Sequence, residues 1–222
     1  MINCTNVGFA YDEHLIFSDV SLTVSKGEFA YIVGETGCGK TTLMRLLYMD
    51  LVPTAGVVNV DSFSSKSIKR RKLYRLRRKL GIIFQDYKLL DDRSVYDNVT
   101  FVLQAVGYST RDMKMQATHA LTQVGLIHRK NSPVGELSGG EQQRLSIARA
   151  IVKDPVAILA DEPTGNLDPV TSADILTLLK KINLGGTTVL LATHNYELIR
   201  KFPARTIMIK NYCCEEIDPT KL

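Results

Sequence analysis

The sequence predicts an α/β protein with a mainly parallel sheet, an antiparallel β flank and an inserted helical subdomain. Three observations predict this class. Short apolar runs alternate with segments of helical spacing, the opening segment alternates between apolar and polar residues, and strand patterns vanish over a long middle stretch. Strands that alternate with helices favour a parallel sheet with crossover connections. We therefore expect a single domain over 1–222, with core and flank at about 1–85 and 155–222 and a helical subdomain at about 86–154.

The strands follow from the apolar runs. Ile2–Tyr11 and Val20–Val24 alternate and are expected to form the antiparallel flank. Glu28–Val33 is expected to be a buried strand, because its apolar residues run directly into a glycine loop. The same reasoning predicts later strands at Leu80–Phe84, Val156–Ala160, Thr188–Ala192 and Thr206–Ile209.

The helices follow from apolar residues three and four positions apart. Thr41–Asp50 has leucines at this spacing directly after the glycine loop. Val95–Val106 and Met113–Val124 are expected to be helices of the inserted subdomain, ended by Gly107 and Gly125.

One basic segment carries more than the whole net charge. The chain has a formal net charge of +5, and residues 66–79 contain nine basic residues and no acidic one, so the rest sums to 5 − 9 = −4. This excludes an overall nucleic-acid-binding surface. Leu73, Leu76 and Leu80 predict an amphipathic cationic helix, which is either a solvated face or a contact for anionic lipid headgroups or an acidic partner loop. In the second case, charge reversal at Arg70 and Arg71 weakens membrane recruitment.

The composition excludes several classes of protein. Apolar residues make up 45% and charged residues 23%, which is close to the globular average and excludes disordered, collagen-like and rod-like chains. No apolar run approaches the roughly 18 residues that a membrane span needs, and the first four residues do not begin a secretion signal. The four cysteines fit no zinc spacing. We therefore expect a cytoplasmic protein with free thiols.

A phosphate-binding loop follows the first buried strand, and its match to G-x-x-x-x-G-K-[ST] reads Gly34-Glu35-Thr36-Gly37-Cys38-Gly39-Lys40-Thr41, with Thr42 next. The glycines let backbone N–H groups turn toward phosphate oxygens at a helix N-terminus. Lys40 is expected to reach the β- and γ-phosphates, and the Thr41 hydroxyl to ligate Mg²⁺. The alternative is a plain glycine turn at a helix start. The motif predicts a P-loop NTPase core.

Two acids end a later strand and are expected beside this loop. Asp161 and Glu162 follow the apolar run Val156–Ala160, and open α/β sheets bind ligands at the carboxyl ends of their strands. Asp161 is expected to hold Mg²⁺ through water, and Glu162 to orient or deprotonate the attacking water. The alternative is an Asp-Glu-Pro turn leaving a strand.

A second anion-binding helix start is predicted in the middle of the chain, and it comprises Ser138, Gly139, Gly140, Glu141 and Gln142. Its hydroxyl, backbone N–H groups and helix dipole suit a phosphate. Because the chain already has a phosphate site, the simplest use is to close over the γ-phosphate held by a second copy. Ser138 and Glu141 also form a capping-box pattern, which is compatible with that use.

The chain resembles ABC-type ATPases over essentially its whole length, in the order and spacing of the phosphate loop, Gln85, Leu137–Gln142, Asp161-Glu162, Asp168 and His194. The resemblance implies an ABC ATPase fold around a RecA-like core, with ATP and Mg²⁺ as cofactors. It implies that Tyr11 stacks on adenine and that Gln85 senses Mg²⁺, water and a membrane partner. It also implies that residues 165–168, ending in Asp168, join two active sites across a dimer. His194, together with Lys40, would contact the transferred phosphoryl group.

Within that superfamily the chain is similar to the FtsE family in residues 84–90, 93–99 and 161–168. This resemblance implies a homodimer with ATP at the interface and an FtsX-like polytopic membrane protein as partner. It further implies peripheral association with the inner face of the cell membrane, a role in cell division, and no nucleic-acid partner.

Three alternatives stay open at this point. The first is the ATPase of a lipoprotein-release or macrolide-export transporter, which shares residues 161–168 with the FtsE family. The second is a member acting on DNA or ribosomes, although the coiled-coil insert or second ATPase unit of such members is missing from this sequence. The third is a scaffold without turnover, which Glu162 and His194 disfavour.

Two departures from the family pattern concern cysteines. The family places a glycine turn after the last core strand, where this chain has residues 210–214, including Cys213 and Cys214. Asn211 tolerates positive φ, so a turn is still expected there. Cys38 sits in the phosphate loop beside a helix N-terminus, which predicts a lowered thiol pKa.

Overall fold

Parallel strands form the centre of the structure, a computed structural model that describes residues 1–219. β3 (Phe29–Val33) lies between β8 (Thr188–Ala192) and β9 (Arg205–Lys210), and β7 (Ala157–Asp161) joins β8 to β6 (Leu80–Ile83). All four of these neighbour pairs are parallel. The predicted α/β class is confirmed, and the five core strands lie within two residues of their predicted bounds.

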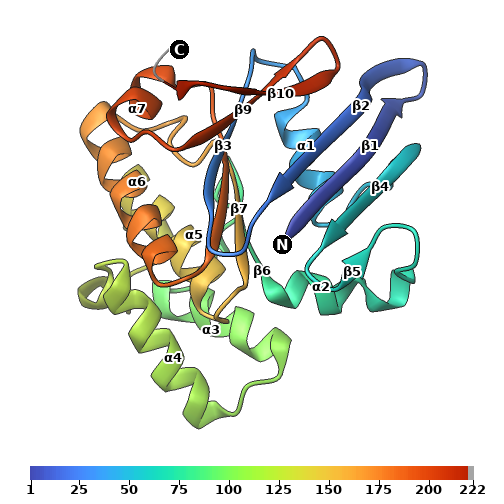
Figure 1. Ribbon diagram of the computed structural model, residues 1–222. Coiled ribbons are helices and arrows are strands. Elements are labelled where there is room, and N and C mark those ends of the chain that lie inside the picture. The colour runs from blue at the N-terminus through green and yellow to red at the C-terminus, as the bar shows by residue number, and fades with distance from the viewer. Residues whose placement is uncertain (220–222) are drawn as a thin grey trace.

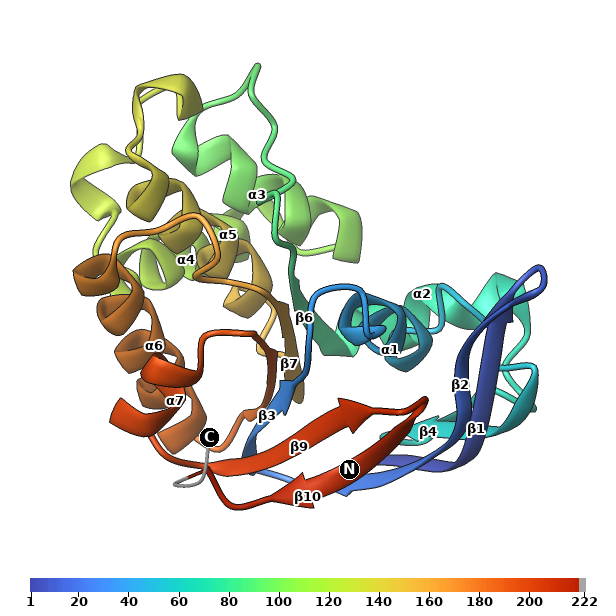
Figure 2. The ribbon, with the colours of Figure 1, turned by 90° about the horizontal axis from the view of Figure 1, so that it is seen from above.

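The central strands are buried on both faces, which explains their continuous apolar sequence. On β3, Tyr31 and Val33 belong to one core cluster, whereas Ala30 and Ile32 belong to another. The helices of residues 95–201 cover the first face, while α1 (Lys40–Leu47) and the flank cover the second. Figure 2 shows α1 in the angle between the parallel strands and the flank.

The flank is antiparallel, as predicted, with β1 (Ile2–Tyr11) paired to both β2 (His14–Val24) and β4 (Ala55–Val60). β2 begins six residues before the predicted Val20, because its first half pairs with the end of β1. The two-residue β5 (Phe63–Ser64) continues this edge.

The last two strands form a hairpin that joins the core to the flank. β10 (Cys213–Ile217) is antiparallel to β9 and meets β2 at the pair Cys213 and Asp19. The turn between the strands places Asn211 and Tyr212 at φ of 49° and 64°. The turn expected without the family glycine is therefore present, and Asn211 adopts the left-handed conformation.

Helices and no strand occur between β6 and β7. The α-helices are α3 (Val95–Val106), α4 (Thr110–Gln123) and α5 (Gly139–Ile151), and two 3-10 turns lie between α4 and α5. Ser94 and Ser109 cap the first two helices, and Gly107 ends α3 in the left-handed conformation. Figure 1 shows α3 and α4 on the side of the sheet away from β1 and β4. The last helices are α6 (Pro169–Leu184) and α7 (Tyr196–Lys201).

The basic segment departs from its prediction. Its helix is short, with a 3-10 turn at Arg70–Lys72 followed by α2 (Leu73–Lys79). Backbone bonds to Ser64 hold the preceding residues in turns, and Leu80 pairs as the first residue of β6. The predicted stripe of three leucines on one helix is therefore wrong, since the helix carries only the first two.

Within residues 1–219, no helix has the length and apolar character that crossing a bilayer requires.

Candidate active site

The phosphate loop connects β3 to α1, and its conformation depends on glycine at two positions. Gly34 has φ 153° and Gly39 has φ 107°. A Cβ at Gly34 would lie 2.6 Å from Cys38 Sγ and 2.8 Å from the Ile209 carbonyl oxygen. A Cβ at Gly39 would lie 2.8 Å from atoms of Ile16 and Phe17. The loop itself and β9 therefore leave no room for a side chain at Gly34, and β2 of the flank leaves none at Gly39.

The start of α1 is open to an anion. Its N-cap is Gly39, which offers no side-chain acceptor, and its first turn contains no acidic residue. The positive end of the helix dipole is thus not neutralised by the chain itself. Lys40 is only 7% exposed, and its Nζ donates to the carbonyl oxygens of Gly34 at 2.9 Å and Glu35 at 3.1 Å. These bonds curl the loop around the lysine.

Glu162 and His194 meet at the carboxyl ends of β7 and β8. Glu162 Oε1 lies 2.8 Å from His194 Nδ1 and 3.6 Å from Lys40 Nζ. The Glu162 carboxylate is buried, its backbone N–H donates to the Ala192 carbonyl, and its other oxygen has no hydrogen-bond partner. An ionised carboxylate can only accept hydrogen bonds. We therefore assign a proton to Nδ1 of His194, which donates to the Glu162 carboxylate. The unpaired oxygen is thus a buried acceptor without a donor.

Asp161 lies beside the Thr41 hydroxyl. Burial raises the pKa of the Asp161 carboxyl, and the neighbouring Thr41 hydroxyl lowers it by less. Oδ1 of this carboxyl is buried without a hydrogen-bond partner. Hydroxyl and carboxylate oxygens are ligands that Mg²⁺ binds, so Thr41 and Asp161 fit the predicted ion.

One cavity of about 230 Å³ gathers all four predicted catalytic residues. Its lining comprises Thr36, Gly37, Gly39, Lys40, Thr41, Thr42, Gln85, Glu162 and His194. Every one of these residues was predicted from the sequence. Asp161 and the remaining loop residues lie adjacent to the cavity without lining it. The structure thus brings together residues that are up to 158 positions apart, since 194 − 36 = 158.

Tyr11 lies outside this cavity, at the end of β1. The residue is 39% exposed, and its ring packs edge-on against Phe9, with centroids 4.9 Å apart. Its hydroxyl lies 3.3 Å from a guanidinium nitrogen of Arg45 on α1. Arg45 was not predicted as a neighbour of Tyr11, because a lone arginine on a helix surface has no distinguishing spacing. Stacking of adenine on Tyr11 stays a prediction.

The second helix start also lies outside the cavity. Ser138 accepts from the Glu141 backbone N–H, and the Glu141 carboxylate accepts from the Ser138 N–H, so the predicted capping box is present. Asp168 caps the start of α6 by accepting from the backbone N–H groups of Val170 and Thr171. A Cβ on Gly140 would lie 2.7 Å from the Thr171 side chain. The start of α5 is therefore packed against the first turn of α6.

The expectation for Cys38 is wrong in direction. Burial raises the pKa of its thiol and outweighs the lowering effects of Lys40 and the loop N–H groups. Free Cys38 is therefore less ionised at neutral pH than an ordinary cysteine.

Comparisons with known proteins agree with this geometry. A family model described as ABC transporter matches residues 17–165. The cell division ATP-binding protein FtsE of Streptococcus pneumoniae is 47% identical over 192 residues, which cover 86% of this chain and 84% of its own. The protein of the same name in Bacillus subtilis is 41% identical over 212 residues, which cover 95% and 93%.

Solved structures give the same result. A dimer of the ATP-binding cassette MJ0796 in a post-hydrolysis state, bound to ADP and Pi, superposes with a TM-score of 0.87 at 32% identity, covering 99% of both chains. CbiO1 of Clostridium perfringens, part of the ABC transporter complex cbiONQ, superposes with a TM-score of 0.91 at 27% identity, covering 99% of this chain and 89% of its own. The chain belongs to the ABC transporter family and is an ATP-hydrolysing member of it.

Proposed function

We propose that this chain is the ATPase subunit of a membrane complex and works as an FtsE-like homodimer. The observation that carries the proposal is the cavity in which the phosphate loop meets Gln85, Glu162 and His194. A nucleotide site that also contains a buried carboxylate with one free oxygen is suited to turnover rather than to binding alone.

In this proposal the loop N–H groups and Lys40 hold the phosphates, and positioning supplies most of the catalysis. Mg²⁺, held by Thr41, Gln85 and, through water, Asp161, would neutralise phosphate charge. Glu162, which lines the cavity, accepts a hydrogen bond from the attacking water. His194 fixes the Glu162 carboxylate from the other side and, with Lys40, contacts the transferred phosphoryl group.

A second copy completes the site. The start of α5, Ser138–Gln142, lies outside the chain's own cavity and would close over the γ-phosphate bound by the partner. Asp168, at the start of α6 beside it, would link the two sites. The dimeric MJ0796 structure supports this arrangement, since its chain is covered over nearly its whole length.

The membrane partner is proposed to be an FtsX-like polytopic protein, so that the complex acts in cell division at the inner face of the membrane. The relatives named cell division ATP-binding protein FtsE support the division role over lipoprotein release or macrolide export. We also propose that residues 86–154 move as a helical subdomain against the rest of the domain.

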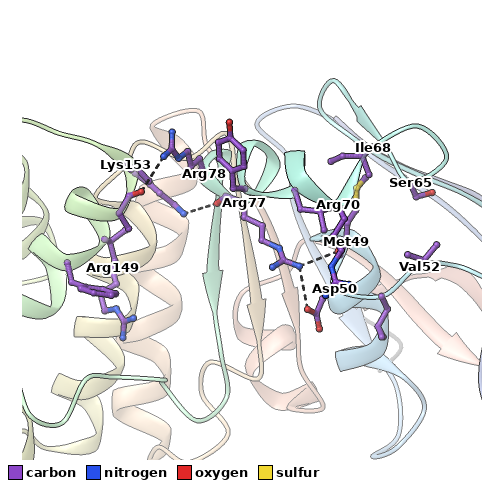
Figure 3. A pocket seen from close by; sticks show the side chains of 17 residues that line it. Met49, Asp50, Val52, Ser65, Ile68, Arg70, Arg77, Arg78, Arg149 and Lys153 are labelled. Atoms are coloured by element: carbon purple, nitrogen blue, oxygen red, sulfur yellow. Dashed lines mark hydrogen bonds and ion pairs between the residues drawn. The ribbon is translucent and has the colours of Figure 1, made fainter.

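A groove outside the nucleotide cavity is the proposed docking place for the partner. It has a volume of about 1050 Å³ and lies between the segment after α1, α2, α3 and the end of α5 (Figure 3). Phe101, Val102 and Ala105 of α3 give it an apolar side suited to a helix. Arg149 in its wall donates to the backbone carbonyl of Lys88, three residues after Gln85, so the groove adjoins the active-site loop.

Affinity capture from native membranes tests the partner. The Glu162→Gln protein with ATP is used as bait, and the co-purifying proteins are identified by mass spectrometry, with the Lys40→Ala protein as the control that does not hold ATP. A polytopic protein with one large extracytoplasmic loop, captured together with cell-wall hydrolases, supports the division role. A permease with a lipoprotein- or drug-handling periplasmic domain would contradict it.

A further inference from the structure

The start of α5 carries an acidic residue, which distinguishes it from the start of α1. The first turn of α1 has no acidic residue, whereas the first turn of α5 contains Glu141. A carboxylate at a helix N-terminus stabilises the helix, but it also repels an anion that approaches the same end. The charge of Glu141 therefore needs a counter-charge if the start of α5 is to receive a phosphate.

Arg129 supplies this counter-charge from a different segment. It ends the 3-10 turn Ile127–Arg129, and its Nε lies 3.3 Å from Oε1 of Glu141. The Nε atom is buried and has no hydrogen-bond partner within residues 1–219, so the carboxylate is the group that balances it. The two side chains are 32% and 28% exposed, so water screens their attraction only in part.

The same guanidinium also holds the chain in front of α5. Nη2 of Arg129 donates to the Glu136 carbonyl at 3.0 Å, and Glu136 ends the 3-10 turn two residues before Ser138. The second oxygen of Glu141 accepts from the Ser138 backbone N–H at 2.9 Å. Arg129 thus contacts the chain on both sides of Ser138, directly at Glu136 and through the Glu141 carboxylate.

This arrangement leaves the donors at the helix start available to a ligand. Oγ of Ser138 accepts from the Glu141 N–H at 3.2 Å, and a serine hydroxyl that accepts in this way still has its own proton to donate. The N–H groups of Gly139 and Gly140 are the first two of the helix and have no intrahelical acceptor. What opposes an anion here is the carboxylate of Glu141.

Glu141 is ionised in this setting. The hydrogen bond from the Ser138 backbone N–H lowers the pKa of its carboxyl most strongly, and Arg129 and His128 lower it further. A negative charge therefore stands in the first turn of α5 at neutral pH, and Arg129 forms the ion pair with it.

We propose that Arg129 is a positioning residue of the shared ATP site, because it neutralises Glu141 and fixes the chain before Ser138 so that the start of α5 can receive the γ-phosphate bound by a second copy. This inference rests on the proposed function, in which two copies share the nucleotide. It assigns no contact between Arg129 and ATP. Loss of Arg129 leaves the charge of Glu141 unbalanced, so it weakens the ATP-dependent dimer without weakening ATP binding by a single chain.

Sedimentation of the Glu162→Gln protein with ATP and Mg²⁺ tests this inference, since it measures the dissociation constant of the dimer. Arg129→Gln removes the charge but keeps a donor for the Glu136 carbonyl, whereas Arg129→Met removes both. Lys130→Met is the matched control, because Lys130 is the neighbouring cation and its side chain is exposed. Binding of a fluorescent ATP analogue to the dilute monomer measures the nucleotide site of a single chain.

We expect both Arg129 variants to raise the dissociation constant of the dimer at least about tenfold, while the ATP affinity of the monomer changes by less than about twofold. Lys130→Met should change the dissociation constant by less than about twofold. Glu141→Gln keeps the capping-box pattern and removes the charge, so adding it to Arg129→Gln should restore the constant to within about threefold. Glu141→Gln alone should tighten the dimer, because Arg129 is then an unbalanced cation.

The opposite outcomes are distinct. Arg129 variants that dimerise like Lys130→Met overturn the inference and leave the proposed function intact. Failure of Glu141→Gln to restore the dimer does the same, since Arg129 would then act only through the Glu136 carbonyl. A Glu162→Gln protein that never dimerises with ATP overturns the proposed function and this inference together.

The unfolding midpoint of each variant is the folding control. If Arg129→Met fails to fold, Arg129→Gln carries the comparison. A dimer loosened by Glu141→Gln alone, in a protein that keeps Arg129, overturns the inference whatever the Arg129 variants do.

Discussion

Alanine at Gly39 should damage the phosphate loop far more than alanine at Gly37, although both residues have positive φ, 107° and 85°. Each substitution forces an L residue into a disfavoured conformation at a cost of about 1–2 kcal/mol. Only at Gly39 would the new Cβ meet other atoms, at 2.8 Å from Ile16 and from Phe17, whereas nothing lies within 4 Å of a Cβ at Gly37. Phe17 is fully buried on β2 and cannot move aside.

The steric conflict adds about 1–3 kcal/mol of overpacking at Gly39. We therefore expect losses in unfolding free energy of roughly 2–5 kcal/mol for Gly39→Ala and about 1–2 kcal/mol for Gly37→Ala. Guanidinium unfolding without nucleotide measures both, and ATP affinity of each variant shows whether the loop is still formed. Equal destabilisation by the two substitutions would refute the argument that the flank supports the loop through Phe17.

Two further predictions concern the basic segment and the metal ion. Reversing the exposed cations Lys69 and Arg71 to glutamate should reduce flotation with phosphatidylglycerol vesicles and leave ATP turnover in solution unchanged, and equal flotation would contradict the lipid contact. Asp161→Asn should raise the Mg²⁺ concentration needed for half-maximal turnover by about 10–100-fold, and an unshifted titration would remove Asp161 from the metal site.

The predictions succeeded where local chemistry decides the structure. The buried strands are continuous apolar runs, and Ser138 with Glu141 carries its own cap. The phosphate loop is fixed by residue type at each position, because only glycine fits at Gly34 and Gly39. Neighbours in sequence were therefore enough to place these elements.

The remaining features depend on contacts between distant segments. Lys66–Lys69 carry helical charge patterning, yet turn bonds to Ser64 keep them out of α2. The pKa of the Cys38 thiol is set by burial within the loop rather than by the nearby helix end. The groove is built from four separate segments, and the contact of Arg149 with Lys88 spans 61 residues. Spacing along the chain carries no sign of such contacts.

The most direct measurement of the central claim is ATP turnover and assembly state of the Glu162→Gln protein. Glutamine keeps the size of the side chain but cannot take a proton from water, so we expect retained ATP binding and turnover reduced by about 10²–10⁴-fold. Sedimentation with ATP and Mg²⁺ should then show an accumulated dimer, because the two subunits dissociate only after ATP is hydrolysed. Turnover at the wild-type rate, or a protein that stays monomeric with ATP bound, would contradict the composite site built around Glu162.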